Sequence, residues 1–92
     1  MITYAEIELF LYDCHSLKDK RSVIKRLKNR LQKELNVAIS ELDHQDLWQR
    51  ATFGIVTISN TREIGEQVIQ QALDIVDAHS EIERTITNVE QR

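Results

Sequence analysis

Residues 17 to 35, LKDKRSVIKRLKNRLQKEL, form the stretch on which the predicted fold depends. On a helical wheel of about 100° per residue, its apolar residues share one face, which is typical of an amphipathic helix: Leu17, Val23, Ile24, Leu27, Leu31 and Leu35. Ser16 with Asp19 three positions later resembles a capping box in which Asp replaces the usual Glu. We therefore predict a helix that begins after Ser16 and ends at Asn36.

The same stretch carries most of the positive charge of the chain. Eight of the twelve basic residues lie in it: Lys18, Lys20, Arg21, Lys25, Arg26, Lys28, Arg30 and Lys33. With two acids, Asp19 and Glu34, the stretch carries +6, so the rest of a chain of net charge −3 carries −9. Such a polarised molecule sorts its partners by the sign of their charge.

The flanking segments predict one α+β domain over residues 1–92. Alternating or β-rich runs predict strands over 3–12, 37–43, 50–59 and 82–89, and a second amphipathic pattern predicts a helix over 61–79. The order strand, helix, strand, strand, helix, strand is that of the ferredoxin-like fold. Right-handed crossovers then give an antiparallel sheet of order 4-1-3-2 with both helices on one face.

In this arrangement the first and third strands are central, and their outward faces form an open sheet surface. We expect Tyr4 on that surface together with four large side chains that form a candidate dimer face: Phe10, Tyr12, Phe53 and Ile55. Base stacking on strand aromatics, as in the RNA recognition motif, is the weaker interpretation, because Glu6 and Glu8 would repel phosphates there. A half-apolar open sheet favours a homodimer through this face.

Composition excludes several classes of protein. No apolar run approaches the roughly 20 residues of a membrane span, and the N-terminal segment lacks the basic region of a signal peptide. A single cysteine excludes an internal disulfide and indicates a reducing cytoplasm. The chain has no Gly-rich phosphate loop, Cys cluster or nucleophile elbow, so we expect no cofactor, no metal site and no catalytic residues.

Isolated titratable residues also carry no catalytic pattern. Cys14 and His15 are adjacent at a strand end, so their side chains point to opposite sides and do not form a nucleophile–base pair. His79 lies near the C-terminus of the second helix, and we expect it to be half-buried with its cationic form favoured by the helix dipole.

Three cations at the start of the basic helix oppose its dipole. Lys18, Lys20 and Arg21 occupy the first turn, where a helix built only for stability would carry acids. Together with free backbone N–H groups they predict a site for an anion such as phosphate. Lys20 is the strongest candidate for a specific anion ligand, because it falls at the centre of the apolar face. The alternative is that its aliphatic stem passes the sheet edge and its ammonium group reaches solvent.

A second motif connects the two middle strands. Its polar and aromatic members are Asp43, His44, Gln45, Asp46, Trp48, Gln49 and Arg50. The spacing of Asp43, His44 and Asp46 matches no metal-ligand pattern, whereas Asp side chains commonly cap turns. We expect Trp48 to close the core at the end of the sheet, and the exposed loop residues to offer a contact site.

Two stretches, Ser16-Leu17-Lys18-Asp19-Lys20-Arg21-Ser22-Val23 and Asp43-His44-Gln45-Asp46-Leu47-Trp48-Gln49-Arg50-Ala51, resemble the YlxP-like family. These are small bacterial proteins of about this length with no established activity. The resemblance covers nearly the whole chain and implies a ferredoxin-like fold and a bacterial cytoplasmic protein. Family members are often encoded near translation and ribosome-maturation genes, which implies an RNA-related partner.

Three classes of function remain. The leading one is a non-enzymatic module that binds RNA or a ribonucleoprotein through the basic helix. The second is a protein-interaction module that forms homodimers or docks its basic helix on an acidic partner. The third is an enzyme for a small anionic substrate, which requires the start of the basic helix and the 43–50 loop to meet around a pocket.

Overall fold

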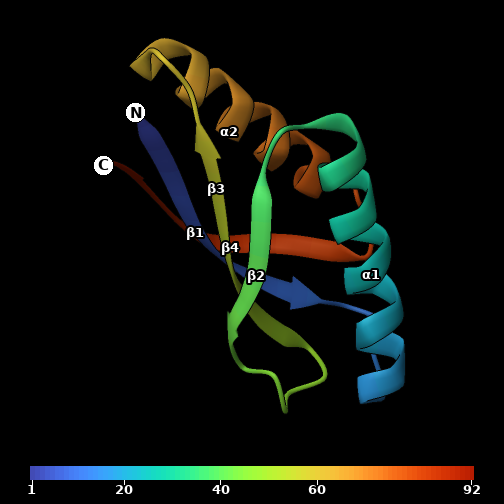
Figure 1. Ribbon diagram of the computed structural model, residues 1–92. Helices are drawn as coiled ribbons and strands as arrows, with labels where there is room; N and C mark the ends of the chain where they lie inside the picture. The colour runs from blue at the N-terminus through green and yellow to red at the C-terminus, as the bar shows by residue number, and fades with distance from the viewer.

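The computed structural model describes all 92 residues and contains one antiparallel sheet that carries two helices (Figure 1). The elements are β1 (Ile2–Leu11), α1 (Leu17–Glu34), β2 (Ala38–Asp43), β3 (Arg50–Ile58), α2 (Arg62–Asp77) and β4 (Ile82–Gln91). The strand order is β2-β3-β1-β4, and every neighbouring pair is antiparallel. The predicted ferredoxin-like arrangement is therefore confirmed, with element boundaries within two residues of those predicted.

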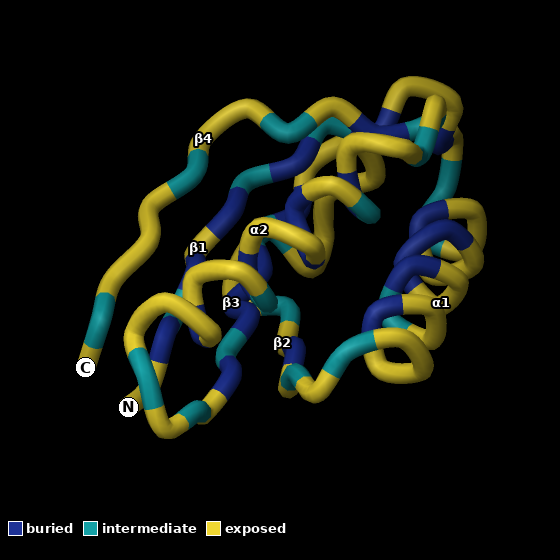
Figure 2. The backbone as a smooth tube through the Cα atoms, turned by 90° about the horizontal axis from the view of Figure 1, so that it is seen from above, coloured by how far each residue is buried: buried dark blue, intermediate teal, exposed yellow.

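The core lies between the sheet and the two helices, which cover the same face of the sheet (Figure 2). β1 contributes the residues that its alternation predicted: Ala5, Ile7, Leu9 and Leu11. The helices contribute residues at helical spacing: Val23, Ile24, Leu27 and Leu31 from α1, and Ile69, Ala72, Leu73 and Val76 from α2. In Figure 2 the buried residues of α1 face inward and its outer side is exposed.

The predicted cap fixes the start of α1. The Oγ atom of Ser16 accepts a hydrogen bond from the backbone N–H of Asp19 at 3.1 Å. The Asp19 carboxylate in turn accepts from the backbone N–H of His15 at 3.1 Å, whereas the Glu of a usual capping box accepts from the capping residue itself. Neither helix combines the length and the apolar character that a membrane span requires.

The expected outward face of β3 is wrong. Phe53 and Ile55 are fully buried, and they pair across the sheet with Ile7 and Ala5 on the core side. β3 is a central strand with apolar residues on both faces, so its alternation does not indicate which face points inward. The dimer face named from the sequence thus loses two of its four members and keeps Phe10 and Tyr12.

The sheet face without helices has two apolar ends separated by acids. At one end lie Ile2 and Ile58, which are paired across β1 and β3. At the other end lies Phe10, opposite Arg50. The alternation of β1 places Glu6 and Glu8 between these ends, as the sequence predicted, and the exposed Ile86 of β4 is paired with Glu8.

Candidate functional site

The largest concave surface is a groove of about 530 Å³ between α1 and β2 together with the loop that follows β2. Its α1 side carries Lys20, Arg21, Lys25 and Lys28, and its opposite side carries Glu41, Gln45 and Asp46. The groove therefore brings together the start of the basic helix and the 43–50 loop, two motifs more than twenty residues apart in the sequence. This is the convergence that an enzyme for a small anion would require.

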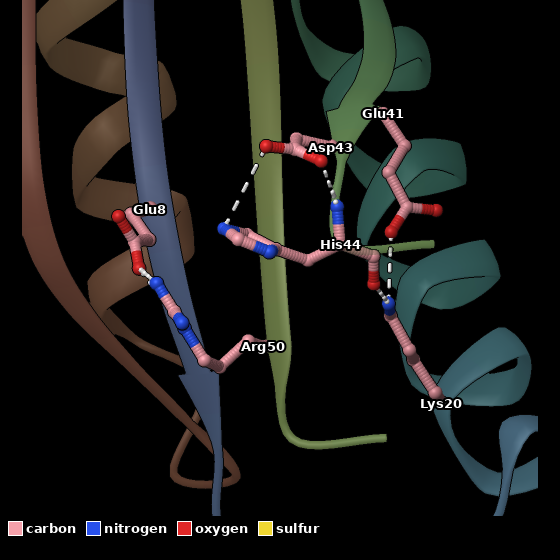
Figure 3. Close-up of polar contacts among 6 residues, drawn as sticks. All are labelled: Glu8, Lys20, Glu41, Asp43, His44 and Arg50. Atoms are coloured by element: carbon pink, nitrogen blue, oxygen red, sulfur yellow. Dashed lines mark hydrogen bonds and ion pairs between the residues drawn. The ribbon is translucent and has the colours of Figure 1, made fainter. Parts of the chain in front are cut away.

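Lys20 does not serve as an anion ligand in this groove, nor does it snorkel into solvent. Its side chain is only 3% exposed, and its Nζ atom lies 2.9 Å from a carboxylate oxygen of Glu41. The same Nζ atom donates a hydrogen bond of 2.6 Å to the backbone carbonyl of His44 (Figure 3). The sequence prediction for Lys20 is wrong because the Glu41 carboxylate already neutralises the ammonium group, and the His44 carbonyl already accepts a hydrogen bond from it.

The loop is shaped by an uncommon backbone conformation at His44. Its φ angle of 64° lies in the left-handed region, which His, Asn and Asp adopt more readily than other residues with a side chain. The Asp43 carboxylate accepts a hydrogen bond of 2.8 Å from the His44 N–H, so Asp43 supports the turn as predicted. No three His, Cys, Asp or Glu side chains gather anywhere in the structure as a metal site would require.

The cations of α1 divide into two groups. On the side away from the groove, Arg26 pairs with Glu81 at 3.3 Å and Arg30 pairs with Glu34 at 2.8 Å. The remaining exposed or half-exposed cations have no carboxylate within ion-pair distance, and we call them the free cations: Lys18, Arg21, Lys25, Lys28 and Lys33. Three of them, Arg21, Lys25 and Lys28, line the groove.

Trp48 does not close the core, which corrects the sequence prediction. It is 51% exposed, and with Phe10 and Leu47 it lines a hollow of about 400 Å³ on the other side of the loop from the groove. Asp46 lines both the groove and the hollow, so the two surfaces adjoin one another at this residue. A basic groove thus adjoins an aromatic surface, an association that no sequence pattern indicated.

The end of the loop is fixed to β1 by polar contacts. The Arg50 guanidinium forms an ion pair with Glu8, with Nε 3.1 Å from the carboxylate (Figure 3). The Gln49 side chain donates to the backbone carbonyl of Tyr12 at 3.4 Å. Tyr12 in turn packs edge-on against Phe10, with the ring centroids 5.1 Å apart. Gln49 and Arg50 therefore hold the end of the loop against β1, and Arg50 neutralises the charge of Glu8.

Cys14, His15 and His79 differ in their burial. Cys14 is buried and His15 is exposed, as their predicted opposite orientations require, and burial, followed by Asp19, raises the pKa of the Cys14 thiol. His79 is half-buried, but the expectation that its cation is favoured is wrong. Burial lowers the pKa of His79, and the positive charge of Arg30 lowers it further.

Glu41 is the functional residue that sequence analysis missed. It follows the buried Ile39 by two positions, so it points to the core side of β2. A signal was present, because Lys20 also occupied a core position on its helix. Two opposite charges at core-facing positions predict a pair, although the sequence alone does not show that these two positions meet.

Comparison with known proteins identifies close relatives of unknown function. A family described as "Protein of unknown function (DUF503)" matches residues 2–89. The chain is 49% identical over 90 residues to "Uncharacterized protein YlxP" of Bacillus subtilis (strain 168), and the match covers 98% of both chains. The resemblance seen in the two sequence motifs is thus confirmed.

Similar solved structures support the fold. The de novo designed protein Foldit4 is similar with a TM-score of 0.61 and 14% identity, over 100% of this chain and 99% of that one. A designed protein with a ferredoxin fold, LFR1 1, has a TM-score of 0.60 and 13% identity, over 100% and 87%. A C-terminal segment of the alpha subunit of aIF2 from Pyrococcus abyssi has a TM-score of 0.54 and 16% identity, over 100% and 50%.

Proposed function

The chain belongs to the DUF503 family of proteins of unknown function, and we propose from its own surface that it binds RNA, alone or in a ribonucleoprotein, through the free cations of α1. The observation that carries this proposal is the row of basic side chains without an ion-pair partner along one helix. Basic side chains that are not already neutralised can replace the counterions of a phosphate backbone.

The extent of the row favours a polyanion over a single small anion. At a rise of roughly 1.5 Å per residue, Lys18 and Lys33 are separated by about 22 Å along the helix. This length suits a series of phosphates. Because the remainder of the chain is acidic, its field should orient a polyanion onto α1 and repel it elsewhere.

A salt titration tests the proposal. If four or five free cations meet phosphates of a single strand, the log–log dependence of affinity on salt should have a slope of about −3 to −4, at roughly −0.7 per contact. Filter binding of unrelated single-stranded RNA sequences should give similar affinities, because phosphate contacts carry no sequence information. An excess of inorganic phosphate at matched ionic strength should not compete, which separates a polyanion site from a small-anion site.

Two matched double variants locate the contact on α1. Lys25→Gln with Lys28→Gln removes two free cations beside the groove, and Arg26→Gln with Arg30→Gln removes two cations that are already paired. The first should weaken every RNA and flatten the salt slope by about 1.4, whereas the second should have a smaller effect. Undetectable or salt-independent RNA binding would overturn the proposal and favour an acidic protein surface as the partner of α1.

A second candidate function is self-association through the sheet face that carries no helices. Ile58 is 68% exposed there, Ile2 is also exposed, and both line a shallow hollow with Val37 and Val56. Exposed apolar side chains that adjoin one another are characteristic of protein interfaces. This apolar end is a different surface from the four residues named from the sequence. Its hollow is lined in part by Asn36 and Val37, just after the end of α1, and shares no lining residue with the groove.

A further inference from the structure

We propose that the bound RNA is single-stranded and that one of its bases stacks on Trp48, in the hollow that adjoins the groove. This inference rests on the proposed RNA binding and adds the form of the RNA and the site of one base. It assigns the aromatic part of the 43–50 motif, which the basic helix by itself leaves without a role.

The first support is the exposure of Trp48. Half of this large side chain faces solvent, although Trp is highly buried in most proteins. Phe10 and Leu47 border the same hollow, so a planar base entering it would find apolar walls as well as an aromatic ring. Stacking on an aromatic face is how proteins hold unpaired bases, whereas the bases of a duplex are already stacked on one another.

The second support is that the hollow adjoins the basic groove. Both surfaces include Asp46, at the tip of the loop between β2 and β3. A strand whose phosphates meet Arg21 and Lys25 in the groove can therefore cross the loop and direct its next base toward Trp48. A cationic path combined with a stacking surface is the usual arrangement for single-stranded nucleic acid.

The two carboxylates along this path should affect RNA binding differently. Glu8 lies close to the hollow, but its charge is neutralised by Arg50. Asp46 has no ion-pair partner and lies where the strand would cross, so it should oppose binding. Replacement by the isosteric amide, Asp46→Asn, should therefore strengthen binding of single-stranded RNA at low salt.

Trp48 is the only tryptophan of the chain, which makes it a site-specific probe. Titration of the full chain with single-stranded oligoadenylate should quench its fluorescence, and an RNA duplex of equal charge should quench it less. Trp48→Ala should weaken single-strand binding by roughly 5- to 150-fold, while Trp48→Phe should retain most of the affinity because its ring can still stack. Neither variant should alter the salt slope, because the ring meets no phosphate.

The outcomes separate this inference from the proposed function. If Trp48→Ala binds oligoadenylate as tightly as the wild type, or if Asp46→Asn leaves the affinity unchanged, the stacking site is wrong, and RNA binding through α1 stands as long as Lys25→Gln with Lys28→Gln still weakens it. If the wild type binds neither the single strand nor the duplex, both proposals fail. Far-UV circular dichroism of each variant confirms that the fold is intact.

Discussion

Lys20 of α1 and Glu41 of β2 form an ion pair of 2.9 Å that closes the inner end of the groove. Lys20 is almost fully buried and Glu41 is 22% exposed, so the pair is shielded from solvent on one side only. The His44 carbonyl accepts a hydrogen bond from the same ammonium group, which ties the loop to the same helix. This contact holds the basic helix and the 43–50 motif together, so the shape of the proposed RNA site depends on it.

Removal of the ammonium group should destabilise the fold. Lys20→Met keeps the length of the side chain but leaves a half-buried carboxylate and a carbonyl without their partner, so we expect a loss of about 2–3 kcal/mol in the free energy of unfolding. Urea denaturation measures this loss. Lys18 is exposed in the same turn of the helix, so Lys18→Met provides the control. It should change the free energy of unfolding by less than about 0.5 kcal/mol.

A double variant distinguishes a pairing role from simple packing. In Lys20→Met with Glu41→Leu both charges are gone, so most of the lost stability should return. The coupling between the two positions follows from the thermodynamic cycle of the four proteins. If the double variant is as unstable as the sum of its single variants, the ion pair does not account for the burial of Lys20.

The fold could be predicted from the sequence because the apolar periodicity of most elements indicated a single core-facing side. In β1 one face is apolar throughout and the other carries Glu6 and Glu8, so Ile7 and Leu9 could be assigned to the core directly. In α1 the apolar stripe and the cap at Ser16 fixed both the orientation and the start of the helix. β3 lacked such a signal, since both of its faces are apolar, and Phe53 was placed outside. Phe53 faces the core because it pairs with the core residue Ile7, and the pairing register cannot be read from the sequence of a single strand.

For the candidate site, the sequence predicted the positive charge of α1 but not which of its cations are paired or which way Trp48 points. The basic residues of α1 could be located as a set, because a helical wheel depends on sequence spacing alone. The partners that neutralise Lys20 and Arg26 lie 21 and 55 residues away, so their effect required the tertiary structure. Trp48 was expected to close the core at the end of the sheet, but the loop turns it outward, and loop direction has no periodic signal.

Gly65 allows α2 to approach β1 closely. A Cβ atom at this position would collide with the Oγ1 atom of Thr3 and would lie 3.1 Å from the Oγ of Ser59. Gly65→Ala should therefore lower the free energy of unfolding by about 1–3 kcal/mol, although Ala is the better helix former by up to roughly 1 kcal/mol. Thermal denaturation measures the loss. The same substitution made together with Thr3→Ala should be less harmful relative to Thr3→Ala alone, because the obstructing oxygen is then absent.

His79 should make stability depend on pH. Burial, the largest cause, and the charges of Arg30 and Arg26 lower its pKa from the ordinary value of 6.5, while Glu81 opposes this shift. As pH falls through about 6.5, the unfolded chain takes up this proton before the folded one, so stability declines until the folded pKa is reached. Urea denaturation at several pH values between 8 and 5 should show this decline, and His79→Gln should reduce it. An equal decline in the variant would assign the effect to other groups.

The apolar end of the sheet predicts the state of association. Ile2 and Ile58 are paired across β1 and β3, and the hollow that they line shares no residue with the groove, so a second copy of the chain can cover them without filling the groove. If the protein self-associates through this surface, Ile58→Glu should shift sedimentation at high micromolar concentration from dimer to monomer, because the interface would bury an unpaired charge. Phe10→Glu, at the opposite end of the same face, is the matched control and should leave the dimer intact. A wild-type protein that sediments as a monomer at this concentration, or a dimer that dissociates only with Phe10→Glu, would contradict the assignment of Ile2 and Ile58 to the interface.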